Sequence, residues 1–199
     1  MSSCDWSGCH PIVSEYHDKE WGVPLFDDIK LFEFLILECM QCGLSWETVM
    51  KKRQIFRDCF DNYDFVKIAS YGQEDIERIM GTEGMLRSLP KIKAVINNAN
   101  CYIRLREEFG SFSSYIWGYS DGKVIVYDRK EDRLPASNGL SERIAKDLKK
   151  RGFKFLGAVT VYSFLQSCGV VNDHGEHCPC FKRITEKYPV IKLPIDNEK

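Results

Sequence analysis

The apolar residues of this chain recur with a helical period over most of its length. Residues 28–41 are apolar on nearly every side, which predicts a buried helix. Residues 45–60 predict a second helix with one apolar face, and the basic run Lys51, Lys52 and Arg53 lies on the opposite face. The same pattern predicts further helices over residues 65–70, 74–80, 88–109, 112–119, 142–151 and 158–168.

Strand signals are weak in comparison. Residues 123–127 could pair as a short strand, and residues 128–138 are expected to form a loop. Beyond residue 182 the chain is polar with spaced prolines. We therefore expect an all-α fold in which residues 1–182 form one domain and residues 183–199 form a peripheral C-terminal tail.

The first 27 residues are rich in Trp, His, Cys, Gly and Pro and show helical spacing only over 11–17. Trp6, Tyr16 and Trp21 are large aromatic residues that are costly to leave in solvent. We therefore expect this segment to be an ordered arm. Its rings are candidates for lining a binding site.

The link between the two first long helices contains the most unusual residue. Glu38 continues the apolar run near the C-terminal end of its helix. A carboxylate there is desolvated and faces the negative end of the helix dipole, so it needs compensation. A ligand's donor groups are one candidate, and the alternative is a glutamate turned to solvent at a frayed helix end. Gly43 ends this helix, and Ser45 can cap the next one, which opens with Trp46.

Composition is that of an ordinary soluble globular protein. The 199 residues are 44% hydrophobic and 29% charged, with a net charge of -1. This balance gives no global support for a nucleic-acid partner, so such a site would have to be a local basic patch. We find no charged-then-apolar leader and no run of the ~18 apolar residues that a membrane helix needs. Nine cysteines without disulfide-like regularity then indicate a reduced, cytoplasmic compartment.

Cysteine and histidine gather near both ends of the chain. The N-terminal group is Cys4, Cys9, His10 and His17, and the C-terminal group is His174, His177, Cys178 and Cys180. Two Cys and two His can form a tetrahedral zinc site, and a metal with four protein ligands is structural. Such a site would close nearly the whole chain into a loop. Spacing alone leaves the choice of ligands open, and the alternative is separate surface side chains without a metal.

Residues 148–157 predict the end of one helix, a tight hairpin and the start of another helix. The hairpin would expose backbone N–H groups beside a helix start, where a phosphate is held favourably. Local positive charge comes from Lys149, Lys150, Arg151 and Lys154. The pattern indicates a contact to DNA backbone through Gly152, Lys154 and Gly157, and the alternative is a solvated basic face.

Taken together, these residues resemble the 3-methyladenine DNA glycosylase I family of the helix-hairpin-helix superfamily. The resemblance extends from Cys4 to about Cys180. It is carried by the blocks Tyr16-His17-Asp18 with Glu20-Trp21-Gly22-Val23-Pro24, Glu38 through Trp46, Lys51-Lys52-Arg53, Lys150 through Gly157, and Asn172-Asp173-His174 with Cys178. It implies a helix-hairpin-helix glycosylase fold whose N- and C-terminal segments are joined by zinc.

The resemblance further implies that the substrate is double-stranded DNA carrying 3-methyladenine. The reaction would hydrolyse the N-glycosidic bond, release the free base and leave an abasic site. A 3-methylated adenine is cationic and already a good leaving group, so the enzyme's main tasks are to extrude the base and to distinguish it from adenine. An aromatic pocket suits such a base through stacking and cation–π attraction.

Tyr16, Glu38 and Trp46 line the base pocket in the family, and Trp6 and Trp21 are available beside them. The resemblance makes Glu38 the expected catalytic residue, accepting a hydrogen bond from the exocyclic amine and favouring the cationic base by its charge. Two candidates could activate the attacking water: Glu38, or a water held near the sugar.

The resemblance also implies that Gly43 and Leu44 enter the gap left by the flipped nucleotide, a role that suits an apolar wedge at a helix-breaking turn. It implies one structural Zn²⁺ per chain, with the ligands Cys4, His17, His174 and Cys178. Asp173 lies about where related glycosylases often have an attacking aspartate. Because it adjoins a zinc ligand, we expect it to be structural.

The leading hypothesis is a monofunctional glycosylase, because the pocket segments offer no lysine for a Schiff base. We expect it to act as a monomer on chromosomal DNA, without a membrane. One alternative is a non-catalytic reader of damaged or bent DNA, against which the complete set of Tyr16, Glu38 and Trp46 argues. The other is a zinc hydrolase unrelated to DNA, which would need an open metal position that four protein ligands do not leave.

Overall fold

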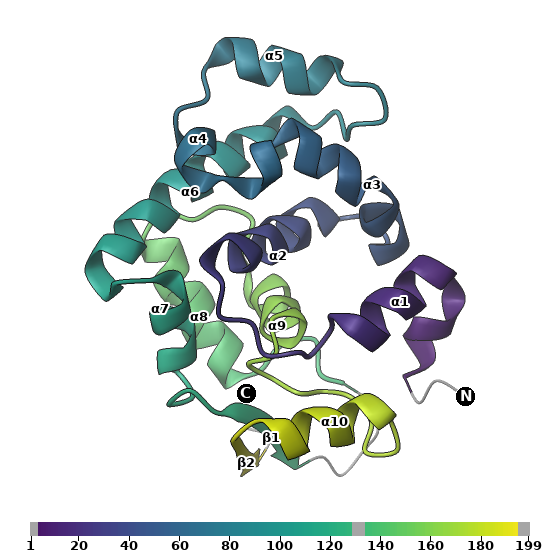
Figure 1. Ribbon diagram of the computed structural model, residues 1–199. Coiled ribbons are helices and arrows are strands. Elements are labelled where there is room, and N and C mark those ends of the chain that lie inside the picture. The colour runs from purple at the N-terminus through teal and green to yellow at the C-terminus, as the bar shows by residue number, and fades with distance from the viewer. Residues whose placement is uncertain (1–3, 129–133, 195–199) are drawn as a thin grey trace.

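The computed structural model describes residues 4–128 and 134–194, and these are mostly helical (Figure 1). The helices are η1 (Asp5–Cys9), α1 (Pro11–Lys19), α2 (Asp28–Gln41), α3 (Trp46–Cys59), η2 (Asp61–Tyr63), α4 (Phe65–Ala69), α5 (Gln73–Gly81), α6 (Leu89–Phe109), α7 (Phe112–Gly118), α8 (Gly139–Lys150), α9 (Ala158–Ser167) and α10 (Pro179–Lys187). The expected mostly helical fold is confirmed, and every helix predicted from periodicity is present within a few residues of its expected ends.

The fold departs from the all-α prediction by one small parallel sheet. Its first strand, β1 (Val124–Asp128), is the expected one, and its partner is β2 (Val190–Pro194). On its other side, β1 bridges to Val171. The predicted domain boundary at residue 182 lies inside α10, and the segment expected to be a tail contains β2. Residues 195–199 lie outside the described part of the chain.

Helix α2 is the centre of the core. All residues from Leu31 to Met40 are buried, and α2 contacts α3, α6, α7 and α9. A helix that is apolar on every side can be stable only when other elements surround it, which explains this central place. Among the described helices, none combines the length and the apolar character that crossing a bilayer requires.

The charged face predicted for α3 is partly buried. Arg53 is only 8% exposed. Its guanidinium donates two hydrogen bonds of 2.7 Å to Glu20, after α1, and one of 2.8 Å to the buried Glu33 on α2. The expectation that Arg53 shares the solvent face of Lys51 and Lys52 is therefore wrong, because two carboxylates on other elements compensate its burial. Loss of one partner would leave a buried charge unpaired, so the cluster fixes α1 against α2 and α3.

Helix α8 begins at Gly139, three residues before the start at residue 142 that was predicted from the sequence. Asn138 is its N-cap, and Oδ1 of Asn138 accepts a hydrogen bond of 2.9 Å from the Ser141 amide. The Ser141 hydroxyl accepts one of 3.0 Å from the Asn138 amide in return. This reciprocal pair satisfies donors at the helix start. Residues 129–133, in the loop expected before it, lie outside the described residues.

The hairpin between α8 and α9 is held from the side by α6. Asn97 donates a hydrogen bond of 2.8 Å to the carbonyl of Gly152, which adopts a φ of +93°. The fully buried Asn98 accepts from the amide of Lys154 at 2.8 Å and donates to its carbonyl at 3.0 Å. Of the two glycines in this segment only Gly152 lies in the turn, because Gly157 has an extended backbone and is the N-cap of α9.

Candidate active site and metal centre

A cavity of about 260 Å³ lies beside the C-terminal end of α2. Its described lining consists of Trp6, Tyr16, Trp21, Glu38, Gln41, Trp46, Leu134, Ser163 and Gln166. The five residues expected in a base pocket therefore line one cavity. They come from the N-terminal arm and from helices α2 and α3, so the site forms only when the arm packs on the helical core.

Glu38 is buried in this cavity, with 4% of its surface exposed. Burial raises the pKa of Glu38 to about 8, and a hydrogen bond with Ser167 opposes this effect more weakly. The alternative of a glutamate turned to solvent is therefore wrong. Its Oε2 atom has no hydrogen-bond partner among the described residues. A buried acceptor without a partner is costly, so this atom is suited to receive a donor group of a ligand.

The ionisation of Glu38 should make the stability of the fold depend on pH. Its pKa is about 8 in the folded chain against an ordinary 4.5, so between these values the folded chain binds more protons than the unfolded chain. The free energy of unfolding should therefore fall as the pH rises from 4.5 to 8, with the loss complete above 8.

In a Glu38→Gln variant this contribution disappears, because an amide does not ionise. The melting temperature of the variant minus that of wild type should therefore be larger at about pH 9 than at about pH 5. Thermal melts followed by circular dichroism at both pH values measure this difference. A difference in melting temperature that is the same at both pH values would contradict the effect of burial on Glu38.

Two pairs of aromatic rings form the walls of the cavity. The ring of Tyr16 lies 5.1 Å from that of Trp46, and the ring of Trp6 packs edge-on against Trp21 at 4.9 Å. Trp46 opens α3 as predicted, after Ser45, whose hydroxyl accepts a hydrogen bond of 3.2 Å from the Thr48 amide. The indole Nε1 of Trp46 is a second buried polar atom without a partner in the described part of the chain.

Helix α9 supplies polar residues to the site that the sequence reasoning missed. Ser163 and Gln166 line the cavity, and the buried Ser167 contacts Glu38. Their spacing could have revealed them, because residues three and four positions apart place these three polar side chains on one face of a mostly apolar helix. Asp173 accepts hydrogen bonds from Gln166, at 2.7 Å, and from Tyr162, at 2.6 Å. Among the described residues, Asp173 is not part of the cavity lining.

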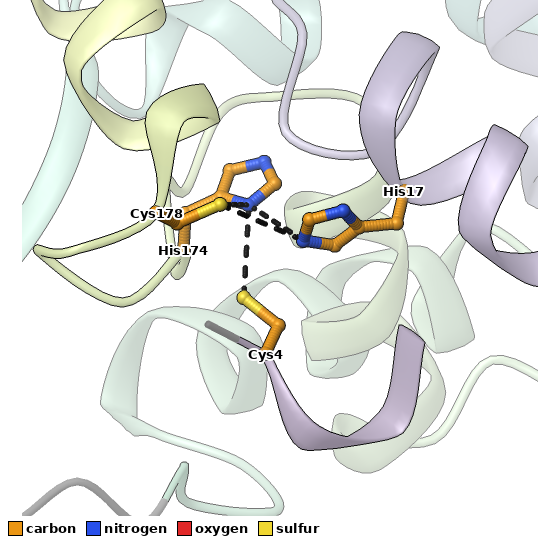
Figure 2. A group of neighbouring side chains, drawn as sticks. All are labelled: Cys4, His17, His174 and Cys178. Atoms are coloured by element: carbon orange, nitrogen blue, oxygen red, sulfur yellow. Dashed lines mark hydrogen bonds between the residues drawn. The ribbon is translucent and has the colours of Figure 1, made fainter. Parts of the chain in front are cut away.

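Four buried side chains from the two ends of the chain form a candidate metal centre (Figure 2). The ligand atoms of Cys4, His17, His174 and Cys178 all lie within 4.8 Å of one another. Nδ1 of His174 is 3.2 Å from Nε2 of His17, 3.6 Å from Sγ of Cys178 and 3.8 Å from Sγ of Cys4. A tetrahedral zinc ion would separate two nitrogens by about 3.3 Å and a nitrogen from a sulfur by about 3.5 Å. The donor set therefore fits a tetrahedral metal.

Hydrogen bonds around this centre occupy one nitrogen of each imidazole and leave the nitrogen that faces the centre available for a metal. His174 uses Nε2 for the Trp21 carbonyl at 2.9 Å, and His17 uses Nδ1 for the Asp18 carboxylate at 2.8 Å. Outer partners of this kind fix the tautomer and the orientation of metal-binding imidazoles. Burial also lowers the pKa of His174 to about 4, so its ring is neutral, as metal binding requires.

The alternative ligands left open by the sequence are placed differently. His10 accepts a hydrogen bond of 3.2 Å from the Ile12 amide and caps α1, and His177 is exposed. Cys180 contacts the Asp18 carbonyl at 3.8 Å and belongs to a second group with His17 and Asp18. The side chain of Cys9 lies outside the described part of the chain. Of the described alternatives, Cys180 is therefore the one near the centre.

The candidate metal centre packs directly behind the aromatic wall of the cavity. The ring of Trp21 lies 4.5 Å from that of His174, and the ring of Trp6 lies 5.5 Å from that of His17. Gly22 permits this approach, because a Cβ atom there would lie 2.9 Å from Nε2 of His174 and its φ is +74°. The position of the cavity wall therefore depends on the metal centre.

The segments expected to contact DNA adjoin one another beside the cavity. Leu44 is 37% exposed at the turn after α2, next to Gly43 with a φ of +81°. The hairpin meets the same end of α2, since Sγ of Cys39 is 3.8 Å from the Lys154 carbonyl. The charge of Arg151 is matched by ion pairs of 2.6 Å with both Asp147 and Glu108. Exposed positive charge at the hairpin therefore comes from Lys149, Lys150 and Lys154.

Solved structures with the same fold are DNA glycosylases. The structure of 3-methyladenine DNA glycosylase I from Staphylococcus aureus, described as the basis of 3-methyladenine recognition, is 36% identical with a TM-score of 0.85, covering 90% of this chain and 96% of that one. Another 3-methyladenine DNA glycosylase I structure is 45% identical with a TM-score of 0.83, covering 89% and 98%. The fold therefore has the architecture of a DNA glycosylase.

Sequence comparisons narrow this class to one family. The methyladenine glycosylase family profile matches residues 6–182. DNA-3-methyladenine glycosylase 1 of Escherichia coli K12 is 42% identical over 91% of this chain and 97% of that protein. The Haemophilus influenzae DNA-3-methyladenine glycosylase is 44% identical over 89% and 96%. The chain belongs to the methyladenine glycosylase family, and the family expected from the sequence motifs is confirmed.

Proposed function

We propose that this protein removes 3-methyladenine from alkylated double-stranded DNA by hydrolysing the N-glycosidic bond, and that it has no lyase activity. The observation that carries the proposal is the aromatic cavity around Glu38, whose Oε2 atom is buried without a partner among the described residues. Family membership supports it, since relatives at 42% and 44% identity are named for this activity.

The cavity suits a cationic purine. The rings of Tyr16 and Trp46 offer π-faces for stacking and cation–π attraction. Oε2 of Glu38 accepts a hydrogen bond from the exocyclic amine. The pKa of Glu38 is about 8 in the empty cavity, and a bound cation would lower it, so the carboxylate forms as the methylated base arrives. Neutral adenine brings no such charge, so the carboxyl stays protonated, adds no ionic attraction, and adenine is bound more weakly.

The reaction breaks the bond between N9 of the base and C1′ of the sugar. The base leaves with the electron pair of that bond and becomes neutral, while a water molecule adds its oxygen to C1′ and loses a proton. Because the leaving group starts as a cation, the protein has to supply orientation and charge complementarity rather than a strong acid. The described lining of the cavity includes no lysine that could form a Schiff base, which supports a monofunctional reaction.

DNA binding is assigned to the two adjoining segments beside the cavity. Leu44 is an exposed apolar side chain beside Gly43, suited to fill the gap left by an extruded nucleotide. Gly157 caps α9 without a side-chain hydrogen bond, so the first amides of that helix can face a phosphate. Gly152 and Lys154 are assigned to the same contact, Gly152 as the turn residue and Lys154 through the positive charge of its exposed side chain, because both of their amides are bonded within the protein.

The metal centre is assigned one structural Zn²⁺ per chain, bound by Cys4, His17, His174 and Cys178. The support is the tetrahedral spacing of two sulfur and two nitrogen donors and their outer hydrogen bonds. When bound, zinc would join the N-terminal arm to the segment before α10. With four protein ligands there is no open position for substrate, so the metal stabilises the fold and takes no part in base release.

Base release from methylated DNA tests the proposed function. Duplex DNA treated with a simple methylating agent is incubated with the protein, and the freed bases are identified by chromatography. We expect free 3-methyladenine and an abasic site without strand cleavage. A folded, zinc-loaded protein that binds this DNA and releases no base would instead be a reader of damaged DNA.

A further inference from the structure

The turn that carries Gly43 and Leu44 is anchored by a side chain from another helix. Lys91 lies in the first turn of α6, far from α2 in the sequence. Its Nζ atom donates one hydrogen bond to the carbonyl of Met40 and one to the carbonyl of Cys42, both of 2.7 Å. The first of these carbonyls belongs to the last turn of α2, and the second belongs to the residue that caps this helix.

The C-terminal end of α2 needs such a partner. The last carbonyls of a helix have no partner within the helix and carry the negative end of its dipole. Helix α2 has no basic residue in its own last turn. Lys91 therefore supplies the missing cation, and its hydrogen bonds are charge-assisted, which makes them stronger than bonds between neutral groups.

Apart from a hydrogen bond of 2.6 Å from the Leu44 amide to the carbonyl of Gln41, little else holds the tip of this turn. A Cβ atom added to Gly43 would meet no heavy atom within 4 Å, and Leu44 is 37% exposed. On the far side the turn is fixed by Ser45, whose side chain caps α3. The direction in which Leu44 points is thus set from both sides, by the Ser45 cap of α3 and by Lys91, which reaches from α6 to the end of α2.

We propose that Lys91 is a positioning residue for base extrusion, which holds the Gly43–Leu44 turn so that Leu44 enters the DNA stack. This inference rests on the proposed function. Glu38 lies deeper in α2, where burial on every side fixes the helix independently of Lys91. Lys91 should therefore affect the reaction on duplex DNA and leave the binding of a free base unchanged.

A matched pair of variants tests this role. Lys91→Met removes the anchor, and Lys93→Met removes the same charge from an exposed position on the same helix. Single-turnover release of 3-methyladenine from methylated duplex should be at least about tenfold slower in Lys91→Met at saturating enzyme, because each of the two charge-assisted hydrogen bonds that are lost corresponds to about a factor of ten when its full contribution is felt in the reaction. Lys93→Met should retain the wild-type rate at saturation, and the two variants should show the same change in apparent DNA affinity.

Three further readouts separate positioning from a merely structural role. Binding of free 3-methyladenine, followed by tryptophan fluorescence, should stay within about twofold of wild type in Lys91→Met. Lys91→Arg, which keeps a cation with several donors, should restore most of the rate. Finally, Lys91→Met should add little to the defect of Leu44→Ala, because both changes remove the same insertion.

Each outcome is decisive. A Lys91→Met variant that releases base as fast as wild type overturns the inference and leaves the proposed function intact. The same holds if Lys93→Met slows base release as much as Lys91→Met does. Equal loss of free-base binding and of rate would make Lys91 a structural residue and would also overturn it. A wild-type protein that releases no base refutes the proposed function instead.

Discussion

Glu38→Gln should lose selective release of 3-methyladenine while keeping the fold. The amide has nearly the same shape as the carboxylate but cannot carry the charge that matches the cationic base. Removing one preorganised electrostatic contact in a water-excluded site slows an enzyme by about 100- to 1000-fold, and we expect a loss of this size in the single-turnover rate. The measurement is chromatography of bases freed from methylated duplex by wild type and variant.

The control is Glu47→Gln, which removes a carboxylate from the exposed first turn of α3, where it pairs with Lys51. This variant should release base at the wild-type rate, because Glu47 is not part of the described cavity lining. A Glu38→Gln variant that still frees 3-methyladenine at the normal rate would remove Glu38 from the mechanism. Circular dichroism of both variants shows whether the fold is kept.

Cys178→Ala should lose the bound metal and much of the stability of the fold together. Structural zinc contributes ~10 kcal/mol or more to the folding of small zinc domains, and 1 kcal/mol moves the melting temperature of a chain of this size by about 2–4 °C. We therefore expect the melting temperature to fall by more than about 10 °C. Elemental analysis of the purified protein gives the metal content, and scanning calorimetry gives the melting temperature.

Cys180→Ala is the matched control, because this thiol lies close by and belongs to the second group of possible ligands. It should keep one zinc per chain. Full metal content in Cys178→Ala, or its loss in Cys180→Ala, would show that the ligand set is wrong. Because the rings of Trp6 and Trp21 pack on His17 and His174, the variant that loses metal should also bind free 3-methyladenine more weakly.

The helical part of the fold could be predicted because its signals are local. The apolar run of α2, broken only by Glu33 and Glu38 between Leu31 and Met40, indicated a buried helix, and the burial of all these residues confirms it. Two features depend on distant partners and carry no local signal. Arg53 resembles any basic residue on a helix face until Glu20 and Glu33 are brought to it by tertiary packing. In the same way, β2 lies in a stretch of chain that is polar on average, and its strand pairs with β1, more than sixty residues earlier in the sequence.

In the candidate site, too, residues with a local sequence signal could be predicted and residues that depend on distant partners could not. Glu38 could be singled out from the sequence because a carboxylate in an apolar helix conflicts with its surroundings. The spacing of cysteines and histidines gave several possible sets of ligands, and three-dimensional proximity distinguishes Cys178 from the exposed His177. Lys91 and Asn98 could not be recognised, because each acts on backbone atoms of a segment about fifty residues away.

The junction of the two chain ends has a consequence for how the protein is made. The contact between Cys4 and His174 spans 170 positions, so the N-terminal arm leaves the ribosome long before its partner exists. Most of the helical core can assemble in the meantime, since domains acquire structure as they emerge. Trp21 can pack against His174 only after this late segment of the chain has been synthesised. A chain that ends before residue 174 would therefore lack the support behind this cavity wall, and we expect it to be inactive in base release.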